Sequence, residues 1–218
     1  MSRLRFKKDG KAVYVSHLDL MRIMRRSLLR AGLPVAHSEG YNPHANITIA
    51  LPLPLGHSST CELMDFEPLE TYSPDETLRR LNESFPDGIT AVNVYDTGRP
   101  IREIEYLRHS IEFIYDREVP TQAADELTAL MNGEGLTVFR KTKKSEGDFD
   151  ISPCIKSASF SISDSGSIIC TAVLTAARPM LNPTYLTQAV TKYIPQYTPD
   201  FVRYKRIEVL DSQMQRFE

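Results

Sequence analysis

Residues 15–44 read V-S-H-L-D-L-M-R-I-M-R-R-S-L-L-R-A-G-L-P-V-A-H-S-E-G-Y-N-P-H, and the rest of the chain is organised around them. Ser16 precedes a run of helical periodicity and is a good N-cap. The negative charge of Asp19 suits the first turn, where the amides have no partner within the helix. Gly32 followed by Pro34 ends the helix. The side chains expected to face the core are Leu20, Met24, Ser27, Leu28 and Ala31.

The opposite face of this helix is basic. Arg22, Arg25 and Arg26 gather on it, with Arg30 at its edge. Residues 1–44 contain nine Lys or Arg and three acidic residues, whereas the following residues up to position 100 contain three and nine. A basic segment of this kind suits a phosphate-bearing or acidic partner, and it equally suits neutralisation by the acidic segment that follows. Both interpretations stay open.

The first residues of the chain alternate as a half-buried strand does. Arg3, Arg5 and Lys7 lie on one side of it, and Leu4 and Phe6 on the other. An Asp-Gly pair follows, which is a hairpin signal. It predicts that the chain continues or returns as a strand just before the helix.

Beyond the helix the pattern alternates between strands and a second helix. Strands are expected at residues 46–51, 60–66 and 89–95. The run Ser73-Pro74-Asp75-Glu76 begins a helix with a cap, a proline at the first helical position and acids in the first turn. The order is strand, helix, strand, strand, helix, strand, which is typical of the split βαβ or ferredoxin-like fold.

Residues 96–104 are the best linker candidate, and after them the same order repeats. Strands are expected at 107–115, 136–141, 154–163, 167–176 and 201–210, helices at 120–131 and 183–194, and a polar segment at 142–150. We therefore predict an α+β chain of two tandem ferredoxin-like halves, residues 1–98 and 105–218. Each half is expected to have an antiparallel sheet with helices on one face.

The composition, 41% hydrophobic and 25% charged, is that of a globular chain with a core. No stretch approaches the roughly 18 apolar residues of a membrane span, and the charged N-terminal residues lack the apolar segment of a secretory signal. The three cysteines are odd in number and have no C-x-x-C spacing, which indicates reduced thiols. We expect a cytoplasmic protein with no membrane partner.

Three blocks of sequence carry a resemblance to a known family. They are S-H-L-D-L-M-R with R-A-G-L-P (residues 16–34), S-E-G-Y-N-P-H (38–44) and A-L-P-L-P-L-G-H-S-S (50–59). With them the chain resembles the radical-SAM-linked protein family, a bacterial domain of unknown function encoded beside, or fused to, a radical SAM protein. Residues 150–157 and Ala177-Arg178-Pro179 are similar to shorter signatures of that family. The resemblance implies a radical SAM protein as partner.

The chain is not expected to be the radical enzyme itself. Such an enzyme holds its four-iron cluster with three closely spaced thiolates, whereas Cys61, Cys154 and Cys170 are far apart in the sequence. Four of the five histidines lie within residues 15–62, but none has the H-x-x-x-H or H-E-x-x-H spacing of a metal site. We therefore expect no metal and no cofactor.

RNA chemistry is an alternative that stays open. Tandem ferredoxin-like domains occur in tRNA pseudouridine synthases and in metal-independent CRISPR repeat-processing endoribonucleases, in which His acts as general acid or base. His44, His57 and Tyr41 are candidates for such roles. The glycine-rich loop of the nucleases and the Arg-Thr-Asp setting of the synthases have no counterpart in this sequence, so both comparisons are analogies of fold. A non-catalytic role is preferred, and enzymatic activity is left open.

Binding is the function that the basic segment favours. RNA-recognition sheets present basic residues to phosphates and aromatic rings to bases, and polar turns such as residues 41–44 suit recognition. We predict a non-catalytic accessory module that binds RNA (tRNA or rRNA) or its radical SAM partner, with a metal-independent RNA-processing or RNA-modifying enzyme as the alternative. The predicted contact residues are Arg3, Arg5, Lys7, Arg22, Arg25, Arg26, Arg30, Tyr41, Asn42 and His44.

Overall fold

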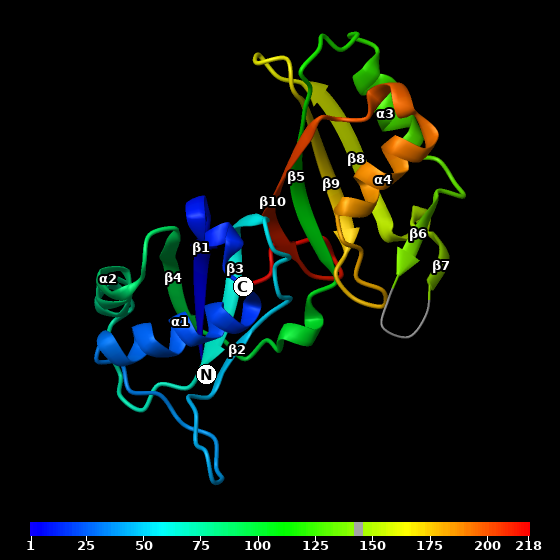
Figure 1. Ribbon diagram of the computed structural model, residues 1–218. Coiled ribbons are helices and arrows are strands. Elements are labelled where there is room, and N and C mark those ends of the chain that lie inside the picture. The colour runs from blue at the N-terminus through cyan, green and yellow to red at the C-terminus, as the bar shows by residue number, and fades with distance from the viewer. Residues whose placement is uncertain (142–145) are drawn as a thin grey trace. The chain divides into compact units, whose positions relative to one another are not determined.

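The computed structural model describes residues 1–141 and 146–218 (Figure 1). The chain forms two compact units, one of residues 1–103 with Glu218 and one of residues 104–217. The described residues form four α-helices together with strands that pair in antiparallel fashion, so the chain is a mixed α and β protein. Of the polar segment expected at 142–150, residues 142–145 lie outside the described part, and Glu146–Asp150 form strand β7.

The first unit has the predicted order of elements. They are β1 (Ser2–Lys8), α1 (His17–Arg30), β2 (Ile47–Ile49), β3 (Ser58–Phe66), α2 (Pro74–Ser84) and β4 (Ile89–Asp96). The strands lie in the order β4-β1-β3-β2, and each neighbouring pair is antiparallel. In this register Leu4 of β1 is opposite Met64 on one side and Val94 on the other.

Both helices of this unit begin where the sequence predicts. The side chain of Ser16 accepts a hydrogen bond from the amide of Asp19, which caps α1. The side chain of Ser73 accepts one from the amide of Glu76, and Pro74 occupies the first position of α2. Each cap satisfies an amide that the helix leaves without a partner, which is worth about 1 kcal/mol.

The core of the first unit lies between the two helices and the sheet. Phe6 on β1, Met24 on α1 and Leu81 on α2 are each 0% exposed. The predicted apolar face of α1 is confirmed, because Leu20, Met24, Ser27, Leu28 and Ala31 are all buried. Burying one such apolar side chain stabilises the fold by roughly 1.5–3 kcal/mol.

The expected hairpin after β1 is wrong. Residues Gly10–Tyr14 form a 3-10 helix in place of a strand. Gly10 has a φ of 51°, and the amide of Ala12 donates to the carbonyl of Asp9, which coils the chain. Since β1 already pairs with β3 on one edge and β4 on the other, it has no edge free for a returning strand.

The second unit repeats the strand order with an insertion. Its elements are β5 (Tyr106–Ile114), α3 (Ala123–Met131), β6 (Thr137–Lys141), β7 (Glu146–Asp150), β8 (Ile155–Ile162), β9 (Ile168–Thr175), α4 (Thr184–Tyr193) and β10 (Phe201–Leu210). Four strands lie in the order β10-β5-β9-β8, all antiparallel. Strands β6 and β7 pair with each other in a separate two-stranded sheet.

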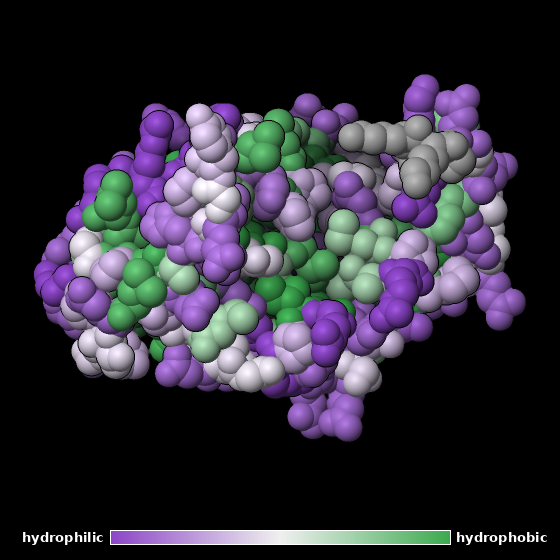
Figure 2. All heavy atoms as spheres, turned by 90° about the horizontal axis from the view of Figure 1, so that it is seen from below, coloured by the Kyte–Doolittle hydropathy of each residue, from purple (hydrophilic) through white to green (hydrophobic). Residues whose placement is uncertain are grey.

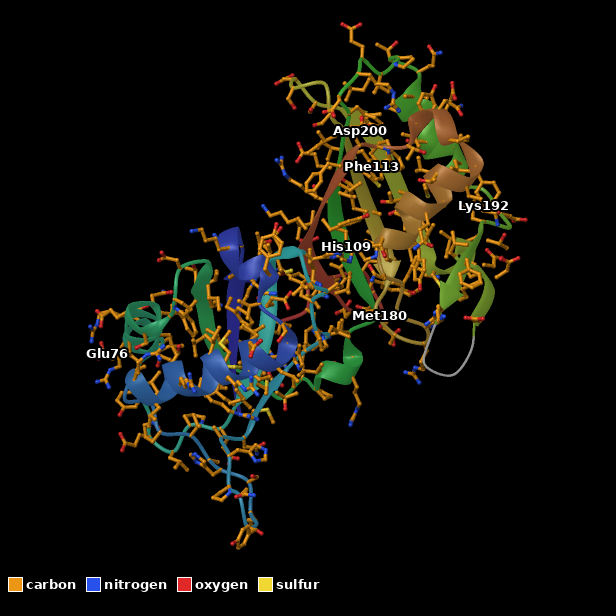
Figure 3. All side chains as sticks on the ribbon, viewed as in Figure 1. Glu76, His109, Phe113, Met180, Lys192 and Asp200 are labelled. Carbon is orange, nitrogen blue, oxygen red and sulfur yellow. The ribbon has the colours of Figure 1, made fainter. Side chains whose placement is uncertain are left out.

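The core of the second unit is built on β5. Alternate residues of this strand are buried, and the ring of Phe113 stacks on that of Phe160 with centroids 5.8 Å apart. Figure 3 shows His109 and Phe113 in the region of the strands and Lys192 at the end of α4. Within residues 1–141 and 146–218, no helix combines the length and the apolar character needed to cross a membrane.

Candidate partner-binding site

The segment after α1 forms a projecting hairpin, which we call the arm (residues 36–46; Figure 1). The amide of Asn46 donates to the carbonyl of Ala36 at 2.8 Å, and the amide of Ser38 donates to the carbonyl of His44 at 2.9 Å. Gly40, with a φ of 133°, makes the turn at the tip. Next to it Tyr41 is 100% exposed. The arm therefore holds an aromatic ring out in solvent on a short, hydrogen-bonded stem.

The two histidines of the arm are held by local hydrogen bonds. His37 Nδ1 lies 2.9 Å from the carbonyl oxygen of Val35. His44 Nδ1 lies 2.9 Å from Ser38 Oγ. With one ring nitrogen engaged in each case, the Nε2 atoms are the ones that remain for an outside partner.

A groove of about 250 Å³ lies between α1 and the base of the arm. Its apolar lining includes Leu29 of α1, which is 81% exposed, and Val35, which is buried. Figure 2 shows apolar residues in green exposed among hydrophilic residues in purple on one face of the molecule. The polar residues that line the groove are Arg25, Arg26, His37 and His44.

The arginines of α1 divide into engaged and available groups. Arg22 Nη1 is 2.8 Å from Asp19 Oδ1, and hydrogen bonds from Ser16 and Arg22 lower the pKa of that carboxyl. Arg30 Nη2 donates to the carbonyl of Ser84 at 2.7 Å, so it caps the end of α2.

Arg25 and Arg26 behave differently. Arg26 is exposed, and within the described residues it has no ion-pair partner. Arg25 is half-buried, and its Nε is buried with no hydrogen-bond acceptor in the described part of the chain. A buried donor without an acceptor is destabilising, so a rearrangement that turned this guanidinium toward an incoming carboxylate or phosphate would be favoured.

The expectation that Arg3 lies on an open sheet face is wrong. Its side chain is 0% exposed, and Nε and Nη2 donate to the carboxylate of Asp65 at 2.6 and 3.0 Å. Nη2 also donates to the carbonyl of Arg99 at 2.8 Å. The register places Arg3 directly opposite Asp65 on β3, so an acidic neighbour neutralises it. Arg5 is half-buried, and Lys7 is exposed.

Among the described residues, the three candidate catalytic side chains are not brought together in the groove. Tyr41 is fully exposed at the tip of the arm, whereas His57 is 4% exposed just before β3. His44 lines the groove, and neither of the other two does. Asn42 is exposed beside Tyr41. In the part of the chain that the structure describes, no three His, Cys, Asp or Glu side chains are grouped as they would be around a metal ion.

Sequence reasoning missed the apolar residues of the groove. Leu29 was outside the predicted core face, and Leu33 and Val35 follow the glycine that ends the helix. A leucine on the basic side of an amphipathic helix was the available signal, and it is a weak one, because single exposed apolar residues are common on protein surfaces.

Residues 2–183 match the family described as "Uncharacterized protein conserved in bacteria (DUF2344)". The chain belongs to this family. The DUF2344 match includes α1, the arm and both walls of the groove. No curated protein matches the chain.

Among solved structures, this DUF2344 chain is similar to a chain in the structure titled "Crystal Structure of a Cbf5-Nop10-Gar1 Complex". The TM-score is 0.54 at 6% sequence identity, with 95% of this chain and 48% of the other covered. The chain therefore spans about half the length of that relative. At this identity the likeness concerns the fold alone.

Proposed function

We propose that this chain is a non-catalytic accessory module whose groove between α1 and the arm binds a protein partner. The partner segment would be acidic and would place an apolar side chain against Leu29 and Val35. The observation that carries the proposal is the pair Arg25 and Arg26 beside that apolar lining, with the Nε of Arg25 buried and lacking an acceptor among the described residues. Protein interfaces are enriched in arginine and in apolar anchors of this kind.

The partner is a radical SAM protein, on the strength of the family resemblance carried by residues 16–59. Most of α1, the arm and the segment after β2 belong to those signature blocks, which supports a shared role in docking. The setting we propose is the bacterial cytoplasm, in line with the DUF2344 description as a domain conserved in bacteria.

We further propose that each unit is a ferredoxin-like domain, with residues 96–104 as the linker. The strand orders β4-β1-β3-β2 and β10-β5-β9-β8 support this proposal, because each corresponds to the same split βαβ order. In the second unit the pair β6 and β7 would be an insertion between α3 and β8.

RNA is the second candidate partner, and one observation favours it. The fully exposed ring of Tyr41 stands on the same arm that borders Arg25 and Arg26. Stacking of a base on an exposed aromatic ring is worth about 1–3 kcal/mol, and arginines would contact the phosphates. Since Arg3, Arg22 and Arg30 are engaged within the chain, the charge available for RNA is small, and a protein partner is preferred.

The test is a binding measurement between the full chain and a radical SAM protein from the same genome, the partner class that the family resemblance implies. The variant Arg25→Glu/Arg26→Glu is expected to weaken binding by about thirtyfold or more, because reversing charges at an interface costs about 2 kcal/mol or more. Arg102→Glu is the matched control, since Arg102 is exposed on the same unit and does not line the groove. Equal binding by both variants would remove the groove from the interface.

The RNA candidate is tested in parallel with labelled tRNA at low and moderate salt. If RNA is the partner, affinity falls steeply with salt and Tyr41→Ala weakens it about tenfold. If the partner is a protein, binding of tRNA is expected to be undetectable even at low salt, both for the parent chain and for Tyr41→Ala.

A further inference from the structure

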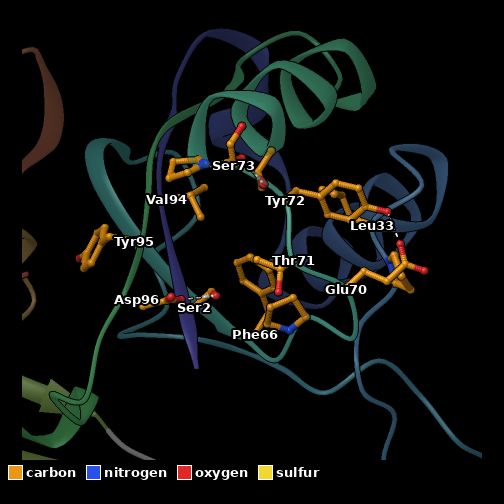
Figure 4. Close-up of a pocket in the computed structure, with 14 residues that line it drawn as sticks. Ser2, Leu33, Phe66, Glu70, Thr71, Tyr72, Ser73, Val94, Tyr95 and Asp96 are labelled. Carbon is orange, nitrogen blue, oxygen red and sulfur yellow. Dashed lines mark hydrogen bonds between the residues drawn. The ribbon is translucent and has the colours of Figure 1, made fainter.

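A second cavity of the first unit, of about 450 Å³, is walled by the loop before α2 and by the ends of β1 and β4 (Figure 4). A volume of this size falls in the range of small-molecule sites, about 300–1,000 Å³. Neither the groove's arginines nor the arm's tyrosine lines it. The cavity adjoins the groove, with which it shares Leu33 and Pro34, but the charged residues of the two differ.

The floor of the cavity is apolar. Leu33, Phe66 and Val94 line it, and they are 5%, 4% and 9% exposed. These side chains belong to the core of the unit, so their positions are fixed by packing. A ligand that covers them gains hydrophobic stabilisation from its own apolar part.

A carboxylate stands on either side of this floor. Ser2 Oγ donates to Asp96 Oδ1 at 2.7 Å, and the hydroxyl of Tyr72 donates to the carboxylate of Glu70. Figure 4 shows these two hydrogen-bonded pairs on opposite sides, with Phe66 between them. Each carboxylate is held by one neutral hydroxyl and has further acceptor capacity.

No basic side chain balances these carboxylates within the cavity. None of the described residues that line it is Lys or Arg. Arg80 contacts one lining residue, since its guanidinium carbon is 4.6 Å from the centroid of the Tyr72 ring. Arg80 does not line the cavity, and its Nε pairs with Glu76 at 2.7 Å. Glu67 and Asp96 also line an adjoining hollow, together with Met1.

We propose that this cavity binds a small organic amine with a cationic group at each end of an aliphatic chain. The apolar chain would cover Phe66 and Val94, one ammonium would contact Asp96, and the other would contact Glu70. Anionic ligands such as nucleotides are disfavoured, because both charged groups of the cavity are negative.

The test is a titration of the isotope-labelled full chain, followed by NMR, with 1,5-diaminopentane as the probe. Pentylamine, with one ammonium, and glutarate, with a carboxylate at each end of a chain of equal length, are the matched comparisons. The diamine is expected to shift the amide signals of Thr71–Ser73 and Val94 and to bind about threefold more tightly than pentylamine. Glutarate is expected to produce no shift there.

Glu70→Gln and Asp96→Asn are each expected to reduce diamine affinity about threefold, and to reduce it to the level of pentylamine. Both changes keep a side-chain oxygen that can accept the hydroxyl hydrogen bond, so the wall of the cavity is preserved. Asp87→Asn is the control, because Asp87 is exposed on the same unit outside the cavity. Unchanged melting temperatures verify that the variants are folded.

Three results would overturn the proposal. They are the absence of shifts at tens of millimolar diamine, equal affinity for diamine and glutarate, and equal losses in Asp87→Asn and Asp96→Asn. The last result would show that the amine responds to the overall charge of the unit and not to this cavity.

Discussion

The ion pair between Arg3 and Asp65 gives the sharpest stability prediction for this chain. The two side chains face each other across β1 and β3, and their exposed fractions are 0% and 10%. Asp65→Ala would leave the guanidinium of Arg3 buried without its counter-charge. Its remaining described hydrogen bond from Nη2 would be the one to the carbonyl of Arg99.

The magnitude follows from the contacts that are lost. Two charge-assisted hydrogen bonds disappear, at 2.6 and 3.0 Å, and each contributes roughly 1.5–3 kcal/mol. Removing one partner of a buried pair costs about 3–5 kcal/mol in free energy of unfolding. For a chain of this length that corresponds to a fall in melting temperature of about 6–20 °C.

The chain has no tryptophan, so far-UV circular dichroism in urea is the suitable assay. Arg79→Ala is the comparison, because its ion pairs with Glu76 and Glu83 are on the surface and are worth about 1 kcal/mol or less. The double variant Arg3→Met/Asp65→Leu should recover most of the lost stability, since apolar residues of similar volume replace the pair. If Asp65→Ala costs no more than Arg79→Ala, the burial argument fails.

Three further changes test the fold. Gly88→Ala should destabilise the chain by about 1–3 kcal/mol in urea unfolding, because Gly88 has a φ of 85° and a Cβ there would lie 2.5 Å from the carbonyl oxygen of Asp9. Gly98→Ala is the control and should have little effect, since no atom lies within 4 Å of the Cβ that it adds. Leu81→Ala should cost about 2–5 kcal/mol through the cavity that it leaves, and a melting temperature equal to that of the parent would contradict this. Hydrogen bonds from two arginines of α2 lower the pKa of Glu76 from 4.5 to about 2. The stabilisation of the fold by these hydrogen bonds is therefore complete above pH 4.5 and is lost as the pH falls toward 2. Glu76→Gln should flatten this part of the curve of stability against pH.

Local signals in the sequence predicted the helices well. Ser16 and Ser73 cap α1 and α2 as expected, and the glycine at position 32 ends α1 because it adopts a φ of 63°. These features depend on residues within a few positions of one another. For that reason they were readable without any knowledge of tertiary contacts.

Contacts between strands that are far apart in the sequence could not be predicted from local patterns. Alternation in β1 separated Arg3 from Leu4, but it did not reveal that Arg3 is buried while Lys7, on the same side of the strand, is exposed. Whether Arg3 meets solvent or Asp65 depends on a register between strands 62 residues apart, which no local pattern encodes. Likewise, Lys8 is buried, and its Nζ donates to the carbonyl of Val15, a bond made only because the intervening residues coil.

The candidate site was predicted in part. The basic face of α1 and the turn at residues 41–44 were identified, and the structure brings Arg25, Arg26 and His44 to one groove. Arg22 pairs with Asp19 one turn earlier, a local contact that the sequence indicates. Arg30 was not separable by sequence, because its hydrogen bond is to the carbonyl of Ser84 at the end of α2. The cavity beside α2 was not predicted, since its lining comes from four separate segments.

The stem of the arm is closed by main-chain bonds, and its five tip residues, 39–43, are exposed. Substitutions among these positions therefore need not disturb the unit beneath, provided that the glycine at the turn is kept. Selection on the choice of partner can act on this tip while selection on folding acts elsewhere. The family resemblance at residues 38–44 falls on this tip, where packing makes little demand on the side chains, so a shared partner is the constraint that we expect to keep them.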